Sequence, residues 1–129
     1  MAKLQCVVVT PEKTEIDREV DALVLPMYDG EMGVLANRAP VIGRLGYGTL
    51  TMTVGSSKER FFIDGGFVQI ENNVVSVLTA RVTPVSQLDV AEAQRALEAS
   101  LEMPGDSEEQ RQLRDAAILR ARGQIRSAR

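Results

Sequence analysis

Histidine and tryptophan are absent from this chain of 129 residues, and it has one cysteine, Cys6. A single cysteine cannot form a disulfide framework within the chain, which fits a reducing cytosol. A chain without histidine has neither a His-based catalytic triad nor a zinc site of the usual Cys/His kind. We therefore predict no metal site and interpret Cys6 as a small buried hydrophobic residue in a strand.

Aromatic residues are scarce, at 4% of the chain, and the formal net charge is only −3. Few aromatic side chains leave little surface for stacking on bases, and a slightly acidic chain has no bulk attraction for phosphate backbones. We therefore expect no nucleic-acid partner. The hydrophobic fraction of 44% is enough for a globular core, and the length favours one compact domain with a small appendage.

Long apolar runs are missing, because no stretch approaches the roughly 18 apolar residues of a membrane-spanning helix. The N-terminal residues also lack the basic start and apolar run of a signal peptide. We expect any role at a membrane to depend on other proteins that hold the chain there. A Walker-type phosphate loop is lacking too, since the glycines at 43, 46 and 48 are not followed by Lys and Ser or Thr. We therefore predict no catalytic residues.

The sequence does contain a β pattern up to about Thr83. Short runs rich in Val, Ile, Leu, Thr and Phe are broken by Gly, Asp and Asn about every eight to twelve residues, which is typical of a sandwich or barrel. Gly55-Ser56-Ser57 and Asn72-Asn73 are predicted to close hairpins, and Gly65-Gly66 to form a bulge or corner. The predicted strands include residues 4–9, 22–27, 48–54, 60–63, 67–71 and 74–78.

After Pro84 the hydrophobic period becomes helical and predicts two helices. Residues 103–106, Met-Pro-Gly-Asp, are expected to end the first helix, and the second should begin at Asp106 or Ser107. Gly123 should weaken the second helix near its end, because glycine costs about 1 kcal/mol relative to alanine inside a helix. The two apolar stripes are predicted to be Val90, Ala93, Leu97 and Leu101, and Leu113, Ala117, Ala121 and Ile125.

Charge is divided unevenly between these two helices. Residues 86–109 hold seven acidic residues and one arginine, whereas residues 110–129 hold six arginines and one acidic residue. An acidic first helix can therefore pair with an antiparallel basic second helix, or the basic helix can swing away to meet an acidic partner. Such a hairpin buries little apolar area, so its stability is marginal unless it docks on a larger surface. Marginal stability is what a mobile arm requires.

The most informative segment is residues 29–35, Asp-Gly-Glu-Met-Gly-Val-Leu, in which two glycines flank Glu31. From these residues alone, an ordinary exposed loop is the simpler interpretation. Followed by Ala39-Pro40, however, the segment resembles the signature Gly-Glu-x-Gly-Val-Leu-Pro-x-His-x-Pro-Leu of the epsilon subunit family of F-type ATP synthases. Residues 43–50, residues 62–78 and Leu88-Asp89 resemble later motifs of that family in the same order, so the resemblance covers essentially the whole chain.

The resemblance implies an α+β, mainly β fold, with a β-sandwich of about ten strands in residues 1–84 and an antiparallel two-helix hairpin in residues 85–129. It implies a non-catalytic central-stalk (rotor) subunit that couples proton translocation to ATP synthesis. The sandwich would dock on the gamma subunit and the c ring. The resemblance also implies a location at the cytoplasmic face of a bacterial plasma membrane, where the complex alone holds the subunit. The residues implied in the ring contact are Asp29, Gly30, Glu31, Gly33 and Arg38.

The resemblance also implies that the hairpin is a mobile regulatory arm, which extends along gamma and inhibits ATP hydrolysis. Arginines of the second helix would then meet acidic surfaces on the alpha and beta subunits of the catalytic head. A solvated helix face that pairs with the acidic first helix is the competing interpretation. The arginines concerned are Arg111, Arg114, Arg120, Arg122 and Arg126.

Two departures from the family pattern affect the expected sites. Ala36 and Arg38 replace the proline and histidine of the signature, which loosens the loop and leaves a fixed cation near Glu31. Glu92 stands where some bacterial members carry the arginine of the ATP-binding motif Ile/Leu-Asp-x-x-Arg-Ala, and a carboxylate repels a triphosphate. We therefore expect no cofactor, disfavour regulatory ATP, and interpret Asp89 as a helix cap rather than a nucleotide ligand. An ATP-sensing β-sandwich module and an unrelated β-sandwich adaptor remain the alternatives.

Overall fold

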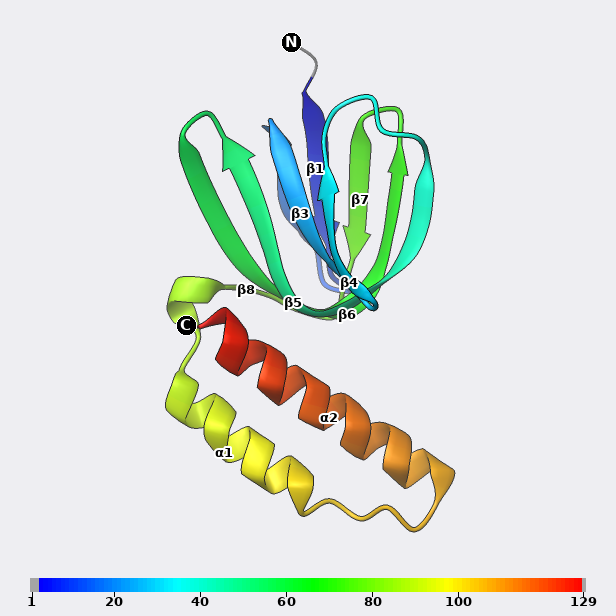
Figure 1. Ribbon diagram of the computed structural model, residues 1–129, viewed down its shortest axis with the longest axis vertical. Helices are drawn as coiled ribbons and strands as arrows, with labels where there is room; N and C mark the ends of the chain where they lie inside the picture. The colour runs from blue at the N-terminus through cyan, green and yellow to red at the C-terminus, as the bar shows by residue number, and fades with distance from the viewer. Residues whose placement is uncertain (1–2, 129) are drawn as a thin grey trace.

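The computed structural model describes residues 3–128 and shows a β body with a helical hairpin beneath one end (Figure 1). The α+β, mainly β fold that ends in two helices is confirmed. The strands are β1 (Leu4–Val9), β2 (Thr14–Val20), β3 (Ala22–Met27), β4 (Gly30–Val34), β5 (Val41–Val54), β6 (Ser57–Glu71), β7 (Val74–Leu78) and β8 (Val82–Pro84). A 3₁₀ turn (Val85–Gln87) precedes the helices α1 (Val90–Leu101) and α2 (Glu108–Ser127).

The strands are hydrogen-bonded in the order β2-β1-β7-β6-β5-β3-β4, and β8 pairs with β6. Neighbours run antiparallel except β1 and β7, which are parallel. β5 and β6 are long, and they sweep across the lower end of the body from one side to the other (Figure 1). The structure describes eight strands rather than about ten, because β5 and β6 each run through the bend as one long strand; residues 60–63 and 67–71 both belong to β6.

The bend in β6 lies at the predicted Gly65-Gly66 corner. Both glycines have positive φ, 69° and 115°, and the pairing of β5 with β6 skips between Tyr47–Asp64 and Leu45–Gly66. A Cβ at Gly66 would lie 1.9 Å from the carbonyl oxygen of Leu78, so only glycine fits there. The two predicted hairpins are also confirmed, since Val54 pairs with Ser57 and Glu71 pairs with Val74 across their turns.

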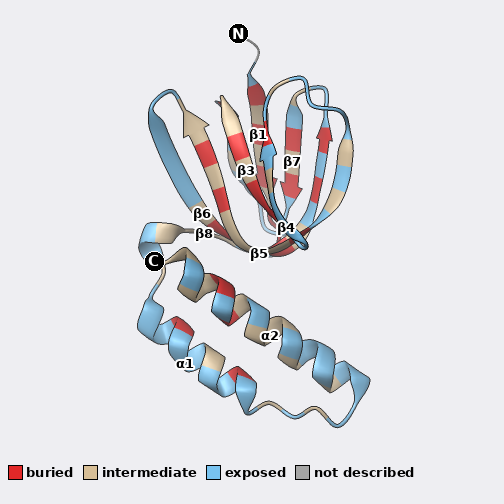
Figure 2. Ribbon diagram, viewed as in Figure 1, coloured by how far each residue is buried: buried red, intermediate tan, exposed pale blue. Residues whose placement is uncertain are grey.

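The hydrophobic core lies inside the β body, where buried residues alternate with exposed ones along each strand (Figure 2). In β1, Leu4, Cys6 and Val8 point inward and are fully buried. The predicted burial of Cys6 is therefore confirmed, and desolvation raises the pKa of its thiol to about 12. The other fully buried large side chains include Leu23, Leu25, Leu45, Leu50, Phe62, Ile63 and Ile70.

The helices begin where their capping residues stop the extended chain. The Asp89 carboxylate accepts a 3.1 Å hydrogen bond from the Glu92 backbone N–H and caps α1, as predicted. Ser107 and Gln110 form a capping box at the start of α2. The second helix continues through Gly123 to Ser127, so the weakening predicted near its end does not terminate it.

The predicted apolar stripes are only partly correct. Val90 and Leu101 of α1 and Leu113 of α2 are exposed, although they belong to the predicted apolar stripes. The residues buried on the two helices are instead small: Ala93, Ser100, Ala121 and Gly123. The hairpin therefore packs through small side chains, and its larger apolar residues contribute little to burial.

Candidate functional site

The β3–β4 turn carries the first part of the predicted ring-contact set. Asp29, Gly30 and Glu31 are exposed, and Gly30 pairs with Met27 at a φ of 134°. Because β3 and β4 reach the lower end of the body here, this turn lies at the same end as the helical hairpin (Figure 1). The Glu31 carboxylate is therefore presented beside α2.

Arg38 lies away from that turn. It belongs to the β4–β5 loop at the opposite end of the body, where the Asn37 backbone N–H donates to the Asn73 side-chain oxygen at 2.6 Å (Figure 1). The Arg38 guanidinium reaches back only to the Met32 sulfur, at 3.3 Å. In residues 3–128 Arg38 forms no ion pair with Glu31, so the expected cation beside Glu31 is absent there. Gly33 is exposed on β4, between Glu31 and the loop that carries Arg38.

The arginines of α2 differ in what they contact. Arg111 donates to the Glu108 carboxylate at 3.1 Å and to the Gly105 carbonyl at 3.0 Å, and Arg114 lies 3.6 Å from the Asp115 carboxylate. The two helices pack side by side as an antiparallel pair (Figure 1), but among the described residues no ion pair joins α1 to α2. The acidic side chains of α1 are on exposed positions instead.

Arg120 is the arginine that joins α2 to the β body. Its Nε lies 2.6 Å from an oxygen of Asp64 on β6, and its guanidinium carbon lies 5.4 Å from the centre of the Tyr47 ring. The Asp64 side chain is only 11% exposed, so this ion pair is largely shielded from water. Seven residues further along the helix, Ser127 and the Thr49 hydroxyl form a 2.7 Å hydrogen bond.

Gly123 lies between these two polar contacts, at the closest approach of α2 to the sheet. A Cβ added to Gly123 would lie 2.5 Å from the Tyr47 carbonyl oxygen and 3.2 Å from the Phe62 ring. The first of these atoms belongs to the backbone and cannot move aside like a flexible side chain. Glycine is therefore required for α2 to lie this close to β5.

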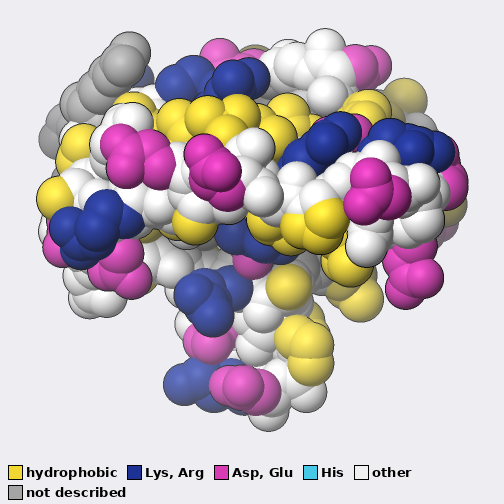
Figure 3. All heavy atoms as spheres, turned by 90° about the horizontal axis from the view of Figure 1, so that it is seen from below, with side chains coloured by type: hydrophobic (Ala, Val, Ile, Leu, Met, Phe, Trp, Pro, Cys, Tyr) yellow, Lys and Arg dark blue, Asp and Glu magenta, His cyan; other side chains and the backbone are white. Residues whose placement is uncertain are grey.

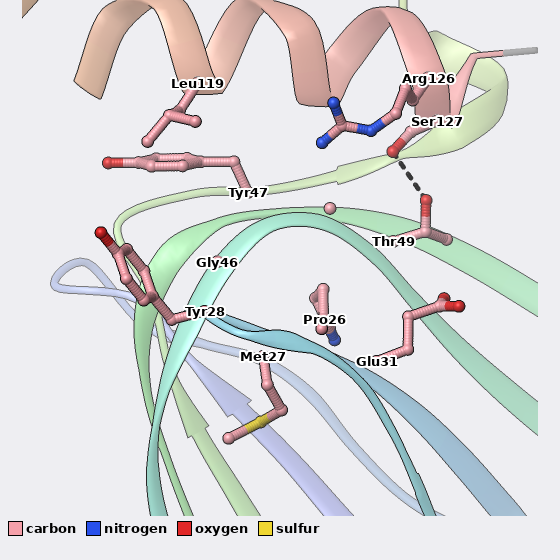
Figure 4. Close-up of a pocket in the computed structure, with 12 residues that line it drawn as sticks. Pro26, Met27, Tyr28, Glu31, Gly46, Tyr47, Thr49, Leu119, Arg126 and Ser127 are labelled. Carbon is pink, nitrogen blue, oxygen red and sulfur yellow. Dashed lines mark hydrogen bonds between the residues drawn. The ribbon is translucent and has the colours of Figure 1, made fainter. Parts of the chain in front are cut away.

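A cleft of about 640 Å³ remains between the β3–β4 turn, the bend of β5 and α2 (Figure 4). Leu119 lies over the Tyr47 ring, and the Arg126 guanidinium extends into the cleft from α2 (Figure 4). Glu31 and Pro26 line the opposite wall. Acidic, basic and hydrophobic side chains are interspersed on the end of the molecule seen from below (Figure 3), so this end has no broad field of one sign.

A second candidate surface is apolar and lies on the outer face of β5, β6 and β7. Phe67 pairs with Leu78, and Ile42 pairs with Gln69, which is two residues from Phe67 on the same face. Ile42 is 81% exposed and Phe67 61%. Their neighbours Val68 and Val77 point into the core. We call Ile42, Phe67 and Leu78 the outer apolar patch; exposed patches of this kind mark interaction sites.

Two kinds of site are not found among residues 3–128. No helix of this part of the chain is long and apolar enough to cross a membrane. Nor do these residues bring together three or more Cys, Asp or Glu side chains that could hold a metal ion.

Asp64, Thr49 and Ser127, which help to dock α2 on the β body, were not predicted from the sequence, and Arg120 and Gly123 were predicted in other roles. Asp64 did carry a signal, because an acidic residue follows the apolar run Phe61-Phe62-Ile63 directly before a glycine pair. Gly123 carried a second signal, since a glycine inside a helix marks either weakness or a close approach. Neither signal identifies its partner, which comes from a distant part of the chain.

Comparison with known proteins places this architecture in a family. The family described as ATP synthase, Delta/Epsilon chain, beta-sandwich domain matches residues 3–85. The ATP synthase epsilon chain of Rhodopirellula baltica is 56% identical over 126 residues and 98% of each chain. That of Carboxydothermus hydrogenoformans is 39% identical over 78% of this chain and 75% of the relative.

Two solved structures have the same fold. The Euglena gracilis mitochondrial ATP synthase, OSCP/F1/c-ring, contains a chain that matches with a TM-score of 0.87 at 22% identity, over 100% of this chain and 83% of that one. The Tetrahymena thermophila mitochondrial ATP synthase, central stalk and c-ring, matches at 0.78 and 12% identity, over 99% and 98%. The family model covers residues 3–85 and the curated relatives cover most of the chain, so the chain belongs to the ATP synthase Delta/Epsilon chain family.

Proposed function

We propose that the chain is the non-catalytic central-stalk subunit of an F-type ATP synthase and couples proton translocation to ATP synthesis as part of the rotor. The observation that carries this proposal is the 56% identity to an ATP synthase epsilon chain over 98% of both chains. The complex holds the subunit at the cytoplasmic face of a bacterial plasma membrane. Synthesis and hydrolysis occur on other subunits.

The β body is the anchor in this proposal, and the outer apolar patch is its contact with the gamma subunit. Ile42, Phe67 and Leu78 come from three adjacent strands, so the patch is rigid before binding. A rigid apolar surface loses little conformational entropy when a partner covers it. That property suits a joint that must transmit torque without slipping.

The turn at Asp29, Gly30 and Glu31 is the proposed contact with the c ring. Its exposed carboxylates suit a polar docking surface, and Gly30 supports a backbone conformation with positive φ. Gly33 lies on the same strand pair. Arg38 is at the other end of the body, so the ring contact proposed here is centred on Glu31 and leaves Arg38 at its margin or outside it.

The helical hairpin is the proposed regulatory arm, which inhibits ATP hydrolysis when it leaves the body and reaches the alpha and beta subunits. Arg122 and Arg126 are exposed, and neither forms an ion pair in residues 3–128. They are the arginines most available to an acidic surface of the catalytic head. Arg111 and Arg114 contact acidic residues of their own helix, and those weak exposed pairs are easily exchanged.

Retention of the full chain on immobilised gamma subunit tests the anchor. Leu78→Glu puts a charge into the outer apolar patch, and we expect it to weaken binding to gamma by about tenfold or more, because a carboxylate buried against apolar surface loses its hydration. Leu101→Glu is the matched control, since Leu101 is 55% exposed on α1 and Leu78 is 53% exposed. Equal retention of both variants and the unmodified chain would contradict the proposed gamma contact.

The ATP-sensing alternative is tested by titrating the full chain with ATP in a calorimeter. The Asp89 carboxylate is engaged as the cap of α1, and Glu92 adds a second carboxylate where a triphosphate would need a cation. We expect no saturable binding. Tight binding would favour the sensor over the proposal that the arm works without a nucleotide.

A further inference from the structure

The arm is held on the β body through one short part of α2. In residues 3–128, the side-chain hydrogen bonds between hairpin and body are those of Arg120 with Asp64 and of Ser127 with Thr49. Gly123 lies between them against the Tyr47 carbonyl. Arg120, Gly123 and Ser127 are spaced by three and four residues, so they share one face of α2. Release of the arm therefore breaks these two hydrogen bonds and uncovers the Phe62 ring, which lies against Gly123.

The Asp64–Arg120 pair is asymmetric. Asp64 is 11% exposed and Arg120 is 41% exposed, so the carboxylate depends on its partner far more than the guanidinium does. Without Arg120, a docked arm leaves a shielded carboxylate unpaired, whereas a released arm lets water reach it. Removal of Arg120 consequently favours the released arm. Removal of the Asp64 charge has a smaller effect, because Arg120 keeps much of its hydration.

We propose that Asp64, Arg120 and Gly123 form a latch that keeps the arm docked, so that Arg120 opposes inhibition whereas Arg122 and Arg126 promote it. The inhibitory half of this statement rests on the regulatory arm proposed above. Two residues on one helix then act in opposite directions, although Arg120 and Arg122 are chemically identical. The difference arises because Arg120 faces Asp64 and Tyr47, while Arg122 is exposed and faces neither.

The latch is tested on the full chain by the distance between spin labels at Lys58→Cys on β6 and Gln112→Cys on α2. Both positions are exposed, and the buried Cys6 with its raised pKa does not compete for the label. We expect one dominant distance in the parent chain. Arg120→Gln should lower the ratio of docked to released arm by about tenfold or more, as expected for a broken shielded pair. Arg122→Gln, the same change two residues away, should leave the ratio unchanged.

A second variant removes no charge. Gly123→Ala places a methyl group against the Tyr47 carbonyl, so it should release the arm while making α2 a better helix. Gly105→Ala is its control, because the added Cβ meets only the flexible Arg114 side chain. A rise in helix content together with a longer distance between the labels is the expected result. If Arg120→Gln and Gly123→Ala both leave the arm docked, the latch is wrong.

ATP hydrolysis by the reassembled synthase separates the latch from the proposed inhibitory role. With the arm released, Arg120→Gln and Gly123→Ala should lower hydrolysis, while Arg122→Gln combined with Arg126→Gln should raise it. If the labels show that the arm is released but hydrolysis stays unchanged, the latch is supported and the inhibitory role of the arm is contradicted. If Arg120→Gln raises hydrolysis as much as the Arg122 and Arg126 pair does, the opposed action of these arginines is overturned.

Discussion

The β body and the helical hairpin are built from the same chain but are stabilised in different ways. The body encloses a continuous core of large side chains, including Leu25, Leu50 and Ile63, which are fully buried. The hairpin buries only small residues on its two helices, and large ones such as Leu113 remain exposed. The body can therefore be stable by itself, whereas the hairpin depends on what it docks against. A rotor subunit with a moving arm needs this difference.

The largest effect should come from a cavity in the body. Leu50→Ala removes a fully buried side chain from β5, and we expect the free energy of unfolding to fall by about 2–5 kcal/mol. The same truncation at half-exposed Leu119 on α2 should cost less than about 1 kcal/mol. Urea denaturation followed by circular dichroism gives both values. Similar losses at the two positions would contradict the contrast between body and hairpin.

An intermediate effect should appear at high pH and report on the body alone. Burial raises the pKa of Cys6 to about 12 in the folded chain from an ordinary value of 9.0, so the unfolded chain loses its thiol proton first. Stability should therefore fall as pH rises from 9 towards 12, by up to about 1.4 kcal/mol per pH unit. Denaturation at several pH values measures this slope. Cys6→Ala should remove this part of the slope, and an unchanged slope would show that the thiol is not its source.

The smallest effect should be confined to the hairpin. Ser107→Ala deletes the capping box of α2, which costs about 1 kcal/mol of helix stability. Amide hydrogen exchange should become faster in α2 and stay unchanged in β1 and β7. Faster exchange throughout the chain would mean that the hairpin and the body unfold as one unit.

The features that the sequence predicted well are those encoded by neighbouring residues. The turns at Asn72-Asn73 and Gly65-Gly66, the Asp89 cap and the burial of Cys6 all follow from local conformational preference or strand alternation. The predicted stripe of α1 was correct at Ala93 but wrong at Val90 and Leu101, because periodicity does not reveal that two thin helices meet through alanine and serine.

The docking site could not be predicted for a different reason. Asp64 and Arg120 are 56 residues apart in the sequence, and their pairing depends on where the bend of β6 places the carboxylate. The same limit applies to Glu31 and Arg38, which are close in the sequence but lie at opposite ends of the β body. Proximity in sequence and proximity in space diverge wherever a strand separates two residues, because each residue advances the chain by about 3.3 Å.

The parallel pairing of β1 with β7 has a consequence for biosynthesis. Residues 5–9 find their partners in residues 74–78, so the β body cannot close until most of the chain has left the ribosome. Until then β1 has only β2 as a neighbour, and its other edge is open to pairing with foreign strands. The arm is synthesised after the strands of the β body on which it docks. Slow translation before residues 74–78 have left the ribosome would therefore prolong the exposure of this edge of β1 and favour aggregation.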